Sequence, residues 1–209
     1  MCTLWNNSPT HQNSHGEAAS RNFCPASLVQ SRVENKRIRF GAPEWLILTG
    51  ATVFILVLFV SAWWEADIRW LHFFQAWLYI ATILLSLRGN RWGHFIGIST
   101  AGFWDYGNIF VTNFFGAGLQ QLSIWIHTGH LPHPDLFIAV PAWTSNFLVI
   151  AGCLWAYVRR PAKSLGDVGR FLIAFVLSTA YFAAAMALFQ PRYLAIFSRL
   201  LHPHLHIFQ

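Results

Sequence analysis

WLILTGATVFILVLFVSAW, residues 45–63, is a run of nineteen residues that contains no Asp, Glu, Lys or Arg. The hydrocarbon core of a bilayer is about 30 Å thick, and a helix of about 17–25 mostly apolar residues crosses it. The run is continuous and does not alternate between apolar and polar residues, so it predicts a transmembrane helix and not a barrel strand. The chain as a whole is 55% hydrophobic and 11% charged, whereas an average soluble domain is about 25% charged. Composition therefore predicts that the chain as a whole is a membrane protein.

Four further apolar runs of similar length follow the first. Together the five runs predict an all-α fold, a polytopic transmembrane helical bundle that occupies residues 41–190. The third run is longer than a bilayer core requires, so we expect that span to tilt or to extend beyond the core. The predicted spans are residues 45–63, 68–87, 92–118, 136–158 and 171–189.

The basic residues are distributed unequally between the two ends of these spans. Three lie on one side, namely Arg69, Arg192 and Arg199. Basic residues accumulate in short cytoplasmic loops, which predicts a cytoplasmic N-terminus, an outer C-terminus and a multi-pass protein of the inner (plasma) membrane. The same bias explains the net charge of +6, so we expect the lipid bilayer as a partner and no nucleic acid. The eleven on the predicted inner side are Arg21, Arg32, Lys36, Arg37, Arg39, Arg88, Arg91, Arg159, Arg160, Lys163 and Arg170.

The two ends of the chain differ from the predicted bundle. Residues 1–40 are polar and without apolar periodicity, which predicts a disordered cytoplasmic tail. Residues 191–209 carry an apolar stripe at helical spacing and end in the His-rich sequence LHPHLHIFQ. This pattern predicts an amphipathic helix that lies on the outer membrane interface.

Asp105 is the one acidic residue of the sequence that lies deep in a predicted span. An ionisable side chain at that depth costs several kcal/mol unless it is paired, protonated or in contact with water. Helical steps of three and four residues place it on one face with Gly93, Gly97 and Ala101. Small residues allow a neighbouring helix to approach closely, so this face is expected to point into the bundle.

Other spans supply polar side chains at similar depth, and the sequence predicts that they gather around Asp105. Asn, Gln and Thr between membrane helices often serve only as structural hydrogen-bonding groups. For Asn146 and Gln75 the structural interpretation is preferred, whereas the cost of the Asp105 carboxyl favours a functional role. The predicted cluster comprises Asp105, Asn108, Asn146, Gln75, Tyr79 and Thr144.

Histidines concentrate on the predicted outer side. Imidazole is a common ligand of zinc, copper, iron and nickel, so an outer transition-metal site is a second hypothesis. The HxxHxxH spacing of the loop at residues 127–133 matches no strict ligand motif, and interfacial histidine without metal is the alternative. The candidate ligands are His127, His130, His133, Asp135, His72, His202, His204 and His206.

Three classes of function follow from these patterns. The cost of Asp105 favours a small permease or an ion- or proton-handling subunit that uses the buried polar cluster. A membrane-embedded enzyme or metal-handling protein with an outer His site is an alternative, although no catalytic motif identifies a reaction. The third class is a structural or accessory subunit that packs against a partner membrane protein or a second copy of itself.

Overall fold

The computed structural model describes residues 41–160 and 163–191. In these ranges the regular structure is entirely helical, which confirms the all-α class. The predicted tail at residues 1–40, and residues 192–209 of the predicted C-terminal tail, lie outside the described residues. The elements are α2 (Ala42–Trp64), η1 (Ala66–Ile68), α3 (Arg69–Leu87), α4 (Arg91–Tyr106), the π-helical η2 (Gly107–Val111), α5 (Phe114–Thr128), α6 (Pro134–Phe137), α7 (Ala139–Val158) and α8 (Gly166–Phe189).

Within the described residues, four segments are each long and apolar enough to cross a bilayer. They are Ala42–Trp64, Ala66–Leu87, Pro134–Val158 and Gly166–Phe189, and they coincide with the first, second, fourth and fifth predicted spans. The first begins where Gly41 precedes Pro43, and the backbone N–H of Gly41 donates to Glu44 Oε2 at 3.0 Å. The Glu44 side chain thus folds back toward the helix start and accepts from an N–H group that the helix itself leaves unpaired.

The third predicted span, residues 92–118, is not one continuous helix. The α-helix changes to a π-helical turn at Gly107, and α5 then begins at Phe114 with its axis turned by 70°. Asn113 adopts a left-handed conformation with φ of 53°, which Asn tolerates better than most residues. The Thr112 hydroxyl meanwhile accepts the Phe114 N–H at 3.3 Å. Two short polar side chains thus end the helix inside an apolar run, and hydrophobicity alone did not reveal the break.

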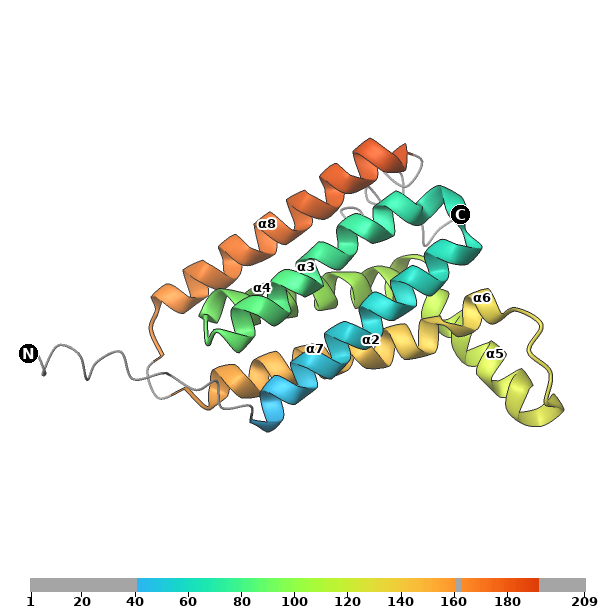
Figure 1. The fold of residues 1–209 in the computed structure, drawn as a ribbon, viewed down its shortest axis with the longest axis horizontal. Helices are drawn as coiled ribbons and strands as arrows, with labels where there is room; N and C mark the ends of the chain where they lie inside the picture. The colour runs from blue at the N-terminus through green and yellow to red at the C-terminus, as the bar shows by residue number, and fades with distance from the viewer. Residues whose placement is uncertain (1–40, 161–162, 192–209) are drawn as a thin grey trace, which may run out of the picture. The chain divides into compact units, whose positions relative to one another are not determined.

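Helix α4 occupies the centre of the helical unit. It packs against α3, α7 and α8, while α2 packs against α7 and α3 (Figure 1). Helix α5 departs from this group and contacts α6 and α7. The inward side of α4 therefore packs against three other helices.

Small residues set how closely the helices approach. A methyl group added at Gly50 of α2 would lie 2.6 Å from the Ser145 carbonyl oxygen of α7. On α4, a methyl group at Gly97 would lie 2.7 Å from the Thr82 methyl carbon and 2.8 Å from Cys153 Sγ. Such distances are shorter than van der Waals contact, so these positions accept only glycine without a shift of the neighbouring helix. The small face of α4 lies inside the bundle, as its spacing predicted.

Gly97→Ala should destabilise the fold, and Gly102→Ala on the same helix should not. The added methyl at Gly97 overpacks the contacts with Thr82 and Cys153, at a cost of about 1–3 kcal/mol. At Gly102 nothing lies within 4 Å of the added methyl, and the higher helix propensity of Ala contributes about 0.5–1 kcal/mol of stability. Unfolding of the two purified variants in mild detergent, followed by circular dichroism, measures the difference. Equal midpoints would contradict the close approach of α4 to α3 and α7.

Candidate functional site

A chain of three hydrogen-bonded side chains joins α3, α7 and α4 in the interior. The Tyr79 hydroxyl donates to Asn146 Oδ1 at 2.8 Å, and Asn146 Nδ2 donates to Asp105 Oδ1 at 3.1 Å. Tyr79 and Asn146 are fully buried, and Asp105 keeps 9% of its surface accessible. The carboxylate of Asp105 thus ends a polar path that begins at a phenol on another helix.

An aromatic ring of α2 packs on the Tyr79 end of this chain. The ring of Phe54 on α2 stacks on Tyr79 with 4.3 Å between centroids. Trp104, which directly precedes Asp105, meets the edge of the same Phe54 ring at 5.0 Å. These contacts fix the Tyr79 ring, and with it the direction in which the hydroxyl points.

The structure brings together three of the six residues of the predicted cluster. Asn108 instead donates to the Trp104 carbonyl of its own helix at 2.8 Å. Thr144 is exposed and its hydroxyl donates to the Val140 carbonyl on its own helix. Gln75 is buried, and its Oε1 has no hydrogen-bond partner within the described residues. These three therefore stand apart from the Tyr79–Asn146–Asp105 chain.

The helix carrying Asp105 changes its hydrogen-bond pattern two residues beyond the carboxylate. In η2 the Thr112 N–H donates to the Gly107 carbonyl at 3.0 Å, five residues earlier in the chain. A π-helical turn of this kind is rare, and such turns occur frequently at functional sites. The last carbonyls of a helix carry partial negative charge, so the end of this helix and the Asp105 carboxylate together favour a cation over an anion.

The candidate outer metal ligands that the structure describes do not converge on one point. The Nδ1–H of His72 donates to the Leu58 carbonyl at 3.1 Å, and that of His127 donates to the Ser123 carbonyl at 2.7 Å. His133 Nδ1 lies 4.0 Å from Asp135 Oδ1. Within residues 41–160 and 163–191, no group of three His, Cys, Asp or Glu side chains is arranged to hold a metal ion. The exposed His130 belongs to no such group either. His202, His204 and His206 lie outside the described residues, so the metal site stays a prediction.

An ionic cluster that sequence reasoning missed lies where α4 and α8 begin. Asp167 is buried, and both of its carboxylate oxygens accept from Arg91 at 2.9 Å. Arg170 donates to the same carboxylate at 2.5 Å, and the Tyr157 hydroxyl at 3.4 Å. The i, i+3 spacing of Asp167 and Arg170 was the available signal. The basic residues had been interpreted only as determinants of orientation.

His94 belongs to a neighbouring contact at the same end of the bundle. Arg160 donates to His94 Nε2 at 3.0 Å and to the Gly89 carbonyl at 2.7 Å. A guanidinium has no acceptor, so Nε2 is the unprotonated nitrogen and the Nδ1–H donates to Ser86 Oγ, 3.3 Å away. With the Asp167 cluster, this contact ties the ends of α3, α4, α7 and α8 together.

No family model, curated protein sequence or solved structure matches the chain. The assignment of a function therefore depends on the geometry and chemistry of these side chains.

Tyr79→Phe should destabilise the fold by about 1 kcal/mol, because Asn146 Oδ1 loses its buried donor. Tyr106→Phe is the matched control, since Tyr106 is on α4, is 40% exposed and makes no hydroxyl hydrogen bond within the described residues. Unfolding of each variant in mild detergent gives the comparison. A Tyr79→Phe variant as stable as Tyr106→Phe would mean that the phenol contributes nothing to this chain of contacts.

Proposed function

We propose that this protein is a multi-pass protein of the inner (plasma) membrane that handles protons through Asp105. The observation that carries this proposal is the hydrogen-bonded chain of Tyr79, Asn146 and Asp105 in the interior of an apolar helical bundle. Asp105 follows Arg91, the first residue of α4, by fourteen residues, which corresponds to about 21 Å along a helix axis. With α4 and η2 crossing a hydrocarbon core about 30 Å thick, this carboxyl lies inside the core and beyond its midplane.

The free-energy cost of burying the Asp105 carboxyl argues for a functional role. An ionisable group inside the membrane is expensive and is found mainly in ion pathways, proton relays and counter-ion sites. Its one hydrogen bond within the described residues comes from the Asn146 amide. No Lys, Arg or His lies within ion-pair distance of Asp105 in that part of the chain, so charge pairing does not account for it.

A proton fits this site better than a metal cation. Hard cations require several oxygen ligands at once, whereas a proton requires a single acceptor. The Asn146 oxygen already accepts from Tyr79, and the Asn146 nitrogen donates to Asp105. The Asn146 amide therefore offers Asp105 a hydrogen-bond donor, and it offers a metal cation no oxygen ligand. The Asp105 carboxylate is then the group that takes up and releases the proton.

The π-helical turn supports the same interpretation. In a membrane, irregular backbone is tolerated where protein buries it or where it lines a water-filled cavity. In transporters, interrupted helices commonly place their ends at an ion site near the membrane midplane. Here the interruption begins two residues after Asp105, at Gly107, so the carboxyl and the helix end lie close along the chain.

Proton flux into proteoliposomes tests this proposal. With a potassium gradient and valinomycin as driving force, vesicles with the wild-type protein should take up protons faster than protein-free vesicles. Asp105→Asn keeps the oxygen that accepts from Asn146 and removes the titrating group, so the flux should fall by at least about tenfold. The matched control is Asp135→Asn, which alters a carboxylate of the short helix α6 whose side chain is 45% exposed. An Asp105→Asn flux equal to that of the wild type, with helix content unchanged, would reject the proposal.

The same proposal includes five crossings, with the N-terminus inside and the C-terminus outside. Its support is the excess of basic residues at the ends of α3, α4, α7 and α8. The Asp167 cluster and the contact of Arg160 with His94 join these ends. In this arrangement α4 and η2 make the third crossing, and α5 lies on the outer side.

Cysteine labelling in intact cells distinguishes the two sides. In a Cys2→Ser/Cys24→Ser background, Cys153 is fully buried and serves as the unlabelled baseline. His130 and Ser164 are both exposed in the structure, so a cysteine at either position can react. In the proposed orientation, a membrane-impermeant maleimide should label His130→Cys in intact cells and Ser164→Cys only after permeabilisation. The reverse pattern would invert the orientation. Labelling of both positions in intact cells would place an even number of crossings between them.

A further inference from the structure

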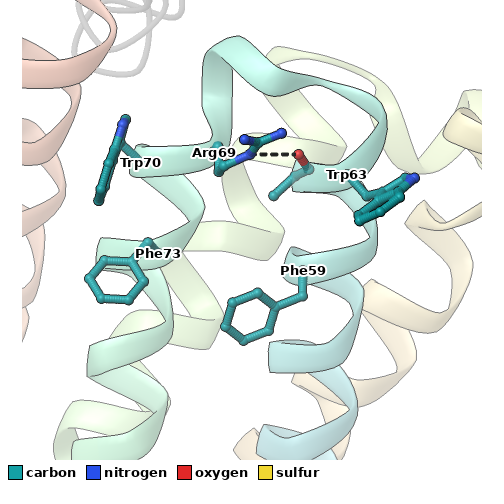
Figure 2. Close-up of a pocket in the computed structure, with 6 residues that line it drawn as sticks. Phe59, Trp63, Arg69, Trp70 and Phe73 are labelled. Carbon is teal, nitrogen blue, oxygen red and sulfur yellow. Dashed lines mark hydrogen bonds between the residues drawn. The ribbon is translucent and has the colours of Figure 1, made fainter.

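A groove lies on the surface where α2 ends and α3 begins, joined by the short η1 connection (Figure 2). Its volume is about 490 Å³, within the range of about 300–1,000 Å³ typical of small-molecule sites. It is distinct from the Tyr79–Asn146–Asp105 chain and shares no residue with it. The residues that line it are Phe59, Ala62, Trp63, Arg69, Trp70 and Phe73.

The walls of this groove are aromatic and open to the surroundings. Trp63 is 83% exposed and Trp70 is 60% exposed, and both lie at helix ends, where interfacial tryptophan is enriched in membrane proteins. Phe59 and Phe73 lie about one helical turn farther from the connection and are also exposed (Figure 2). The groove thus runs from a polar connection along an apolar surface.

Arg69 lies between the two tryptophans at the polar end (Figure 2). Its Nε donates to the Ala62 carbonyl at 3.4 Å, one of the carbonyls that the end of α2 leaves without a helical partner. Within the described residues, the Arg69 side chain makes this one hydrogen bond. No carboxylate of the described residues lies within 4.0 Å of the Arg69 guanidinium. The terminal N–H groups are therefore available to an anion.

We propose that this groove binds one anionic phospholipid of the surrounding bilayer. The lipid phosphate accepts hydrogen bonds from the Arg69 guanidinium, whose planar fork suits phosphate oxygens. One acyl chain lies along Phe59 and Phe73, and Trp63 and Trp70 flank the headgroup. Charge complementarity selects the occupant, since the groove offers one cation at its polar end and hydrocarbon along its length. A zwitterionic lipid fits the apolar part equally well but brings a second cation close to Arg69.

Native mass spectrometry of the full chain in mild detergent tests the selectivity. Phosphatidylglycerol should bind more tightly than phosphatidylcholine with the same acyl chains, by about fivefold, as one basic side chain at a membrane surface contributes about 1 kcal/mol. Arg69→Gln should remove this preference. Arg88→Gln, which alters an exposed arginine just beyond the opposite end of α3, should retain it. A preference that persists in Arg69→Gln, or is lost equally in both variants, would overturn the proposal.

A second measurement leaves Arg69 in place. In phosphatidylcholine bilayers with a small fraction of brominated lipid, brominated phosphatidylglycerol should quench tryptophan fluorescence more than brominated phosphatidylcholine. Trp63→Phe/Trp70→Phe should abolish this excess, because these two indoles lie on either side of Arg69 (Figure 2). Equal quenching by the two lipids in the wild type would reject a selective site. Binding of oleate without binding of phosphatidylglycerol would identify the occupant as a free fatty acid and would reject a phospholipid.

Discussion

The approach of α4 to its neighbours, made possible by Gly93 and Gly97, is the contact on which the interior depends. A methyl group at Gly93 would lie 2.5 Å from the Ser86 backbone nitrogen of α3. With no side chain to separate them, α3 and α7 come near enough for Tyr79 and Asn146 to meet Asp105. Between helices in lipid, packing and hydrogen bonding replace the hydrophobic effect as the main source of association. The small face and the polar chain are therefore two parts of one interface.

The ionic cluster around Asp167 adds to this interface at the end where α4 and α8 begin, close along the chain to Gly93. A buried carboxylate with two arginines keeps its charge compensated, since both Arg91 and Arg170 donate to it. The bundle thus holds two buried aspartates in opposite situations. Asp167 is surrounded by cations and donors, as a structural ion pair requires, whereas Asp105 receives one neutral amide donor. This contrast is the physical reason to assign a function to Asp105 and a structural role to Asp167.

Much of the fold could be predicted from the sequence, because long uncharged runs leave few alternatives to membrane helices. The inward direction of Asp105 followed from the spacing of Gly93, Gly97 and Ala101. The break after Val111 could not be predicted in this way, since it depends on the conformation of Asn113 and on hydrogen bonds of Thr112 within an apolar run. The partners of Asp105 were predicted only as a set of five residues. Helix rotation and depth decide which of them meet, and these depend on packing between spans distant in the sequence.

The π-helical turn at Gly107–Val111 also has a consequence for the register of the chain. Each residue of an α-helix advances the side-chain direction by about 100°, and a π turn accommodates additional chain without interrupting the helix before it. The buried face of α4, which carries Gly93, Gly97 and Asp105, fixes the rotation of α4 about its axis. The rotation of the segment from Phe114 onward is therefore independent of it. An insertion or deletion inside the turn would re-aim α5, at the expense of its contacts with α6 and α7, and would leave the buried contacts of α4 in their original phase.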